Sequence, residues 1–341
     1  MRKIITAAIL AMVVLTGVYA AGGQQGTASP GAGNNPVTFI LATGDAIGSM
    51  RNLMGERFKA ELDKMPELRL TVNHVQGPVL GTASQILDQV VEGSVQVFGN
   101  DISWAAPYDN DFNPMNFGFM FRDLDHMMKY FASPVFTDVA DRIAKANNMR
   151  IMSPVPTASR MFFVIRPIQN ASDFRGMKIR APGLEMFIKS YEAYGASPTT
   201  IAWNEIFLAL KTGLADAAHG PASDVIANQW HLAAPYISKT TDMFAANCWY
   251  VNEAFWQRLS AAQQEGIRKA FTITNQWCLD ESAALEKRDL DTMVSEGATY
   301  LGDFPAAQRE ILRNQAIDAV KRLEASGAWS AGLVDAIQGI Q

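Results

Sequence analysis

Strand-like and helix-like segments alternate from Val37 onward, and this order constrains the fold more than any other feature of the chain. Residues 37–41 (VTFIL) predict a strand, and residues 50–62 carry apolar side chains at helical spacing. Strands are expected again at 68–75 and 95–98, with a helix at 82–91 between them. Such a β-α-β-α-β order is typical of an α/β lobe around a largely parallel sheet.

The same alternation starts again at residues 161–165 (MFFVI), a continuously apolar run that predicts a buried strand. It continues as a strand at 177–180, a helix at 184–194, a strand at 199–201 and a helix at 204–211. From Ala261 to Leu323 the pattern is mostly that of an amphipathic helix. We therefore expect two α/β lobes and a helical C-terminal region, in which a long helix could pack across both lobes.

The composition and the missing motifs exclude several classes of function. Hydrophobic residues make up 48% of the chain and charged residues 18%, which excludes a disordered protein, and a net charge of -5 gives no support for nucleic-acid binding. The sequence contains no phosphate-binding loop, no complete dinucleotide-binding turn and no G-x-S-x-G elbow. Its four histidines lack metal-ligand spacing, so they read as ordinary surface or capping residues. We expect no catalytic residue, no metal and no cofactor.

The N-terminus has the pattern of an export signal. A positive start at residues 1–3 precedes an apolar run at 4–18, which is too short to span a membrane and ends in a small-residue cleavage site at Ala20. We expect a signal peptide at 1–20, with an uncleaved anchor as the alternative. Residues 21–36, rich in Gly, Gln, Ser and Asn, predict a flexible linker. In an exported chain Cys248 and Cys278 could form a disulfide or remain two buried thiols, and their spacing leaves both possibilities open.

Arg180 is the best candidate for a ligand contact on local grounds. It occupies the C-terminal end of the strand at 177–180, and Pro182 suits the start of the next helix. Ligands of α/β sheets bind outside the carboxyl ends of strands, where a guanidinium can grip a carboxylate with two hydrogen bonds. The alternative is a surface arginine in a weak salt bridge. Trp104 follows the predicted strand at 95–98, whose carboxyl end would also face the cleft, and Asn100 could supply a polar contact beside it.

Three spaced motifs point to a family. They are residues 173–180 (DFRGMKIR), 195–198 (GASP) and 203–213 (WNEIFLALKTG). The stretch from Arg160 to Pro221 resembles the solute-binding subunit of tripartite ATP-independent periplasmic (TRAP) transporters. The resemblance implies a two-lobed periplasmic binding protein fold with a cleft between its α/β domains. It also implies a receptor that captures a small organic acid through an arginine-carboxylate pair, closes, and delivers the acid to a membrane permease.

The resemblance implies a set of ligand-binding residues. Arg180 falls on the family arginine that pairs with the ligand carboxylate, and Arg160 lies near a second contact position, although a hinge or interlobe salt bridge is an equal alternative. Trp203 and Glu205 belong to the third motif, and Trp203 could equally be core packing. The family usually carries an asparagine near the ligand where this chain has Gly220. The preceding His219 could therefore face the pocket or merely cap the turn.

The same resemblance sets the expected organisation of the chain. Residues 37–157 and 240–285 should form lobe I, and residues 158–239 and 286–341 lobe II. The protein should be periplasmic, should not be an enzyme, and should bind a small carboxylate and a TRAP permease, without nucleic acid and without membrane insertion after cleavage. The alternative is a secreted sensory receptor or an enzyme that acts on a small organic acid.

Overall fold

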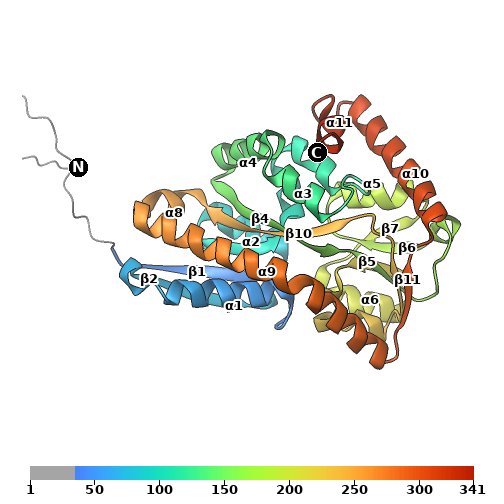
Figure 1. Ribbon diagram of the computed structural model, residues 1–341, viewed down its shortest axis with the longest axis horizontal. Coiled ribbons are helices and arrows are strands. Elements are labelled where there is room, and N and C mark those ends of the chain that lie inside the picture. The colour runs from blue at the N-terminus through green and yellow to red at the C-terminus, as the bar shows by residue number, and fades with distance from the viewer. Residues whose placement is uncertain (1–34) are drawn as a thin grey trace, which may run out of the picture. The chain divides into compact units, whose positions relative to one another are not determined.

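A computed structural model describes residues 35–341; the predicted signal peptide and most of the predicted linker lie outside the described residues. Within that range the strands form a five-stranded and a six-stranded sheet, which define a first and a second lobe (Figure 1). The first sheet, in the order β2-β1-β3-β10-β4, contains β1 (Val37–Thr43), β2 (Leu70–Gln76), β3 (Val97–Asp101), β4 (Met149–Ser159) and β10 (Phe244–Asn252). The second, in the order β11-β9-β5-β8-β6-β7, contains β5 (Met161–Val164), β6 (Lys178–Ala181), β7 (Ser197–Thr200), β8 (Ala217–Gly220), β9 (Tyr236–Lys239) and β11 (Thr299–Asp303).

The predicted two-lobed α/β architecture is confirmed, and each sheet is largely parallel with one strand that runs against the others. β1 runs parallel to β2 and β3, whereas β10 runs antiparallel to both β3 and β4. In the second sheet β5 runs antiparallel to β8 and β9. The chain crosses between the lobes from β4 to β5 and from β9 to β10. The first strand after each of these crossings, β5 or β10, runs antiparallel to its neighbours, so both sheets are mixed.

Helices cover the sheets and extend the C-terminal region. They are α1 (Met50–Asp63), α2 (Ala83–Glu92), α3 (Leu124–Phe131), α4 (Pro134–Asn147), α5 (Glu185–Ala193), α6 (Ile206–Thr212), α7 (Ala222–Val225), α8 (Glu253–Arg258), α9 (Ala261–Ser295), α10 (Ala306–Ala325) and α11 (Leu333–Gln338). Among the described residues no helix combines the length and the apolar character needed to cross a membrane.

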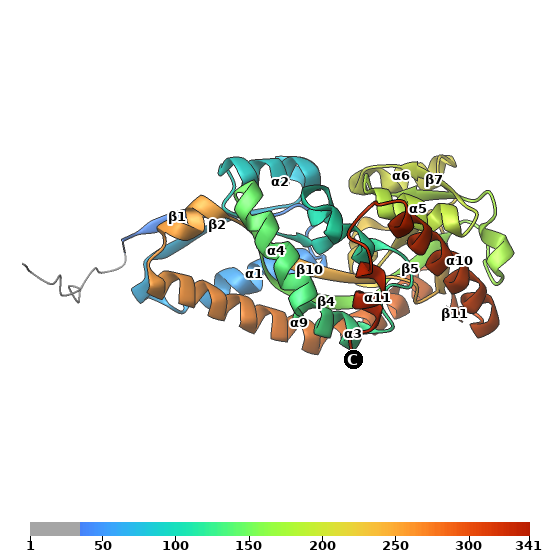
Figure 2. The ribbon, with the colours of Figure 1, turned by 90° about the horizontal axis from the view of Figure 1, so that it is seen from above.

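The long helix α9 spans the two lobes, as its amphipathic pattern suggested. It packs against α1 and β4 in the first lobe and against α7 and β11 in the second (Figures 1 and 2). Its buried residues include Ile267, Phe271, Thr274 and Cys278, whose spacing places them on one face of the helix. Ser260 caps its first turn together with Gln263. The expectation of helix through to Leu323 is interrupted, because β11 separates α9 from α10.

Two short connections also join the lobes. The chain leaves β4 after Ser159 and enters β5 at Met161, so Arg160 alone forms the first connection. The second runs from β9 to β10 through residues 240–243. The two connections are bonded to each other, since the Arg160 backbone nitrogen donates to the Met243 carbonyl at 2.9 Å. Pairs of short connections of this kind are where hinge motion between lobes occurs.

The described cysteines are free, and both are buried. Cys248 lies in β10 and Cys278 in α9. Burial raises the pKa of Cys278 to about 12, so its thiol is protonated and unreactive at neutral pH. The alternative of two buried thiols therefore describes this structure.

Gly118 is required for close packing beside the second connection. A Cβ at this position would lie 2.0 Å from the Tyr194 hydroxyl. That hydroxyl donates to Asp242 Oδ2 at 2.9 Å, so the ring cannot move without losing a buried bond. Gly118→Ala is expected to lower the free energy of unfolding by about 1–3 kcal/mol, measured by urea denaturation. Gly183→Ala, whose Cβ would meet nothing nearer than 3.8 Å, is the control, and an equal loss in both variants would contradict this reading.

Candidate ligand-binding site

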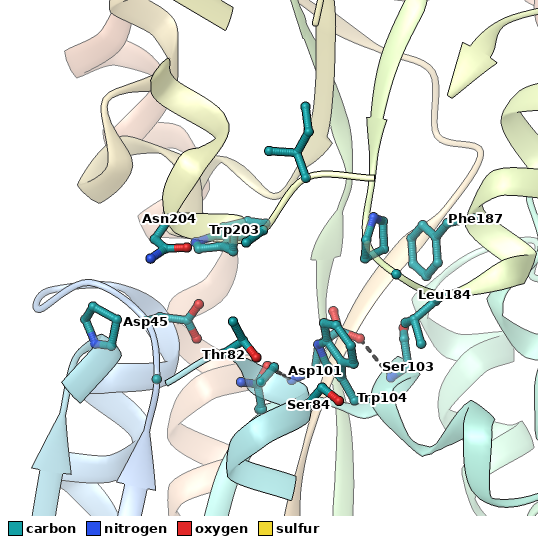
Figure 3. Close-up of a pocket in the computed structure, with 18 of the residues that line it drawn as sticks. Asp45, Thr82, Ser84, Asp101, Ser103, Trp104, Leu184, Phe187, Trp203 and Asn204 are labelled. Carbon is teal, nitrogen blue, oxygen red and sulfur yellow. Dashed lines mark hydrogen bonds between the residues drawn. The ribbon is translucent and has the colours of Figure 1, made fainter. Parts of the chain in front are cut away.

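A pocket of about 350 Å³ is lined by residues from both lobes. The first lobe contributes residues that follow β1 and β3 and the beginning of α2, and the second contributes the end of β6, the beginning of α5 and the segment after β7. Figure 3 shows Trp203 and Asn204 of the second lobe across the cleft from Asp45 and Thr82 of the first. The volume lies within the range of about 300–1,000 Å³ that is typical of small-molecule sites.

The topology explains why the pocket lies here. β1 and β3 are parallel neighbours, so their carboxyl ends meet at one edge of the first sheet. Asp45 follows β1 by two residues, and Asp101 ends β3. In the second sheet Arg180 lies one residue before the end of β6. The ends of strands from both sheets therefore bring charged side chains to one cleft.

The structure places five of the seven predicted ligand-binding residues in this lining, namely Arg180, Arg160, Trp104, Trp203 and Asn100. His219 and Glu205 are not among the residues that line it. Glu205 ends a short 3-10 helix whose first residue, Trp203, does line the pocket. Direct ligand contact by any of the seven stays a prediction.

Arg51, in the first turn of α1, is the centre of a buried ion cluster. Its terminal nitrogens lie 3.1 Å from Asp45 Oδ2, 3.0 Å from Asp224 Oδ2 and 3.5 Å from Asp101 Oδ2. Its Nε donates to Asn247 Oδ1 at 2.9 Å. Burial alone would lower the pKa of Arg51, but the three carboxylates raise it. Burial raises the pKa of Asp224 to about 6 although Arg51 opposes the shift, and Asp45 adds to it.

Arg160 connects the lobe crossing to the same cluster. Its guanidinium pairs with Asp101 Oδ2 and lies 5.3 Å from the centre of the Phe187 ring. Asp101 thus accepts from Arg160 and also faces Arg51. Burial alone would raise the pKa of Asp101, but these two guanidiniums hold it below its usual value. The interlobe salt bridge that the sequence left open for Arg160 is present, and it lies in the pocket wall.

Arg180 differs from the other two arginines because it has no acidic partner. It is 5% exposed, its Nε donates to the Ile201 carbonyl at 2.9 Å, and its guanidinium lies 5.6 Å from the centre of the Trp203 ring. Within residues 35–341 no carboxylate lies within 4.0 Å of its nitrogens. Burial lowers the pKa of Arg180 to about 9, and nearby Arg160 adds to the effect. A buried cation without a counter-ion is costly and needs a functional explanation.

His219 belongs to a buried network beside the second connection. Its ring stacks on Phe162 with 4.0 Å between centres, its Nδ1 lies 3.2 Å from the Tyr191 hydroxyl, and its Nε2 lies 3.4 Å from Asp242 Oδ1. Of the expected surface or capping histidines, His219, His126 and His231 do not lie on the surface, since each is 2% exposed. Burial lowers the pKa of His219 to about 4 although Asp242 opposes the shift, and Arg160 adds to it.

This shift makes stability depend on pH. Between pH of about 6.5 and about 4 the unfolded chain binds a proton at His219 that the folded protein does not, so the free energy of unfolding falls as the pH drops through this window. His219→Gln is expected to remove about 2–3 kcal/mol of that fall. Urea denaturation of both proteins at several pH values measures it. If the free energy of unfolding fell equally with pH in the variant and in the parent protein, His219 would not be the source of the pH dependence.

Arg51, Asp224 and Phe187 are the main members of this site that sequence reasoning missed. One signal for Arg51 was available, because a cation in the first turn of a helix is disfavoured by the helix dipole unless a specific partner compensates. Asp224 and Phe187 lie on the short helix α7 and on α5, and no local pattern marks them.

The described geometry defines a two-lobed receptor whose lobes share one charged pocket. The family model for bacterial extracellular solute-binding protein, family 7, matches residues 48–326, and the chain therefore belongs to this family. It is a solute-binding protein of the TRAP transporter type. The sialic acid-binding periplasmic protein SiaP of Vibrio cholerae is 23% identical over 241 residues, which cover 70% of this chain and 74% of that protein.

Solved structures show the same fold. A TRAP solute-binding protein from Roseobacter denitrificans with bound β-D-glucuronate superposes with a TM-score of 0.83 at 18% identity, covering 89% of this chain and all (100%) of that one. One from Shewanella oneidensis with bound succinate has a TM-score of 0.83 at 16% identity, covering 90% and 99%. These related proteins are solute-binding proteins, and both structures hold organic acids.

Proposed function

We propose that this chain is the periplasmic receptor of a TRAP transporter and that it captures a small organic acid by pairing the ligand carboxylate with Arg180. The observation that carries the proposal is the buried Arg180 guanidinium, which lines the pocket without a carboxylate partner. A ligand carboxylate would supply the missing counter-ion through charge-assisted hydrogen bonds. Sialic acid, glucuronate and succinate, named for the relatives, all carry a carboxylate.

Closure of the lobes follows from the position of the pocket. A ligand on Arg180 of the second lobe would also face Asn100 and Trp104 of the first, so it makes more contacts when the lobes are together. A ligand shifts a population only through such a difference in contact. As the moving bodies we propose residues 37–157 with 240–285, and residues 158–239 with 286–341. The closed form is the species that the membrane permease would receive.

Export is part of the same proposal. Cleavage of the signal at Ala20 would release the chain into the periplasm with the linker at its new N-terminus. The protein would bind and deliver the acid without changing it. Mass spectrometry of the mature N-terminus tests the cleavage.

Ligand binding is tested by thermal shift on the chain that starts at residue 21, stripped of ligand by denaturation and refolding. A ligand at about 100 times its dissociation constant adds about 2.7 kcal/mol to the native state. Carboxylates should raise the melting temperature and neutral sugars should not. The carboxylate pair would be wrong if neutral sugars alone raised it.

Delivery needs a separate measurement. Membrane vesicles with the cognate permease should accumulate the acid unchanged only when the receptor is added. Chemical conversion of the acid by the receptor alone would favour the enzyme alternative, and binding without uptake would favour a sensory receptor.

A further inference from the structure

The charged residues that line the pocket and the one carboxylate that adjoins them form a balanced set of buried charges. Arg51, Arg160, Arg180, Asp45 and Asp101 line the pocket, and Asp224 pairs with Arg51 outside the lining, which makes three guanidiniums and three carboxylates. One ligand carboxylate on Arg180 therefore leaves one negative charge in excess, and a second would leave two. Burial raises the pKa of Asp224 to about 6 even with Arg51 at 3.0 Å, and Asp45 and Asp101 add to the shift, so the ion cluster around Arg51 disfavours further negative charge.

Among the described residues that line the pocket, no free cation remains for a second ligand carboxylate. Arg51 contacts three carboxylates, and Arg160 is paired with Asp101. A carboxylate that reached across the cleft toward either arginine would approach Asp45 or Asp101 at the same time. Like charges brought together in a desolvated site cost several kcal/mol.

The N-terminus of α2 is a place for an anion on the first-lobe side of the cleft, because residues 81–84 line the pocket. Two backbone donors there already have partners from the helix itself. Thr82 N donates to Gln85 Oε1 at 2.8 Å, and Gln85 N donates to Thr82 Oγ1 at 3.4 Å. This capping box already provides acceptors for two backbone N–H groups that a ligand carboxylate would otherwise bind.

The first-lobe residues that line the pocket include hydrogen-bond acceptors and hydroxyl groups. Asp45, Thr82 and Ser84 lie on this side of the cleft, and the indole of Trp104 lies on the same side (Figure 3). A ligand hydroxyl can donate to Asp45 and exchange bonds with the two hydroxyl side chains, and it adds no charge. An aromatic ring face in the lining suits the C–H face of a sugar or polyol chain.

We propose that the ligand is a monocarboxylate whose other polar groups are hydroxyls, and that Asp45 is the residue that discriminates against a second carboxylate. This inference rests on the proposed function, because it takes the first carboxylate to lie on Arg180.

Matched ligand pairs test the ligand class on the native protein by titration calorimetry. D-Gluconate and D-glucarate differ only in the group at the far end, as do D-erythronate and meso-tartrate. The monocarboxylate of each pair is expected to bind about tenfold or more tightly than its dicarboxylate. Equal or tighter binding of the dicarboxylates would overturn the inference and leave the carboxylate receptor intact, whereas no binding by any acid would overturn the proposed function itself.

Threonine serves as a third ligand beside erythronate, because it places an ammonium group where erythronate has its 2-hydroxyl, and it has no 4-hydroxyl. Tighter binding of threonine would overturn the hydroxyl half of the inference.

Asp45→Asn tests the role of the residue. It removes one negative charge and keeps a side chain of the same shape, while Arg51 retains Asp101 and Asp224. The preference for gluconate over glucarate is expected to fall about tenfold, mainly because glucarate binds more tightly. Asp125→Asn, at a carboxylate whose side chain is 74% exposed on α3, makes the same change in net charge and should leave the preference unaltered. An unaltered preference in Asp45→Asn as well would overturn the assignment to Asp45.

Discussion

Replacing Arg180 by methionine is expected to weaken carboxylate binding strongly and, at the same time, to stabilise the ligand-free protein. The side chain is 5% exposed, and burial lowers its pKa to about 9 because no carboxylate balances its charge. Methionine fills similar space without a charge, so the free energy of unfolding should rise by about 1–3 kcal/mol even after loss of the bond to the Ile201 carbonyl. Binding should weaken by about 2–4 kcal/mol, the cost of leaving a ligand carboxylate without its partner.

The two effects are measured separately. Titration calorimetry with the best ligand gives the affinity, and urea denaturation without ligand gives the stability. Arg175→Met is the matched control, since Arg175 lies on the surface five residues earlier in the same motif. Unchanged affinity in Arg180→Met would remove Arg180 from the site. If Arg180→Met lost affinity but was also less stable than the parent protein without ligand, Arg180 would remain a ligand contact. That result would contradict the prediction that the unpaired charge of Arg180 lowers the free energy of unfolding.

The sequence predicted those parts of the fold and the site that depend on local pattern. Arg180 could be found because strand periodicity and the next proline place it at a strand end, and the motif at residues 173–180 marks it independently. The long helix α9 could be found from its apolar spacing over several turns. In both cases the side chains that matter follow one another along the chain at a fixed period.

Other elements are set by contacts between distant segments. β8 (Ala217–Gly220) contains two alanines, a histidine and a glycine, which have little strand preference of their own; it forms because β5 and β6 lie on either side of it. The ion cluster around Arg51 brings together residues from the end of β1, the end of β3 and α7. Its members lie up to about 180 positions apart, so no single-sequence pattern could have assembled them. Trp249 is part of the core, stacked on Phe271 with 4.8 Å between ring centres.

Asp101→Ala is expected to be the most destabilising single change in the pocket. Asp101 accepts from Arg160, lies 3.5 Å from Arg51 and accepts from the Ser103 backbone nitrogen at 2.9 Å. Removing the carboxylate leaves Arg160 buried without an acidic partner, and breaking such a pair costs about 3–5 kcal/mol. Urea denaturation at pH 7 measures the loss. Asp125→Ala, which removes an exposed pair with Lys129, should change the stability by about 0.5 kcal/mol or less.

The pH dependence of this loss distinguishes an ionic role of Asp101 from simple packing. Burial opposes ionisation, but the two guanidiniums hold the pKa of Asp101 below its usual value in the folded protein. The stabilisation is therefore present above the pKa of the unfolded chain and is lost as the pH falls through the lower folded value. The difference between the parent protein and Asp101→Ala should narrow in acid for this reason. If the difference in the free energy of unfolding stayed constant with pH, Asp101 would stabilise the cleft by its shape and hydrogen bonds. Asp101 would then no longer count as a negative charge in the charge balance inferred for the pocket.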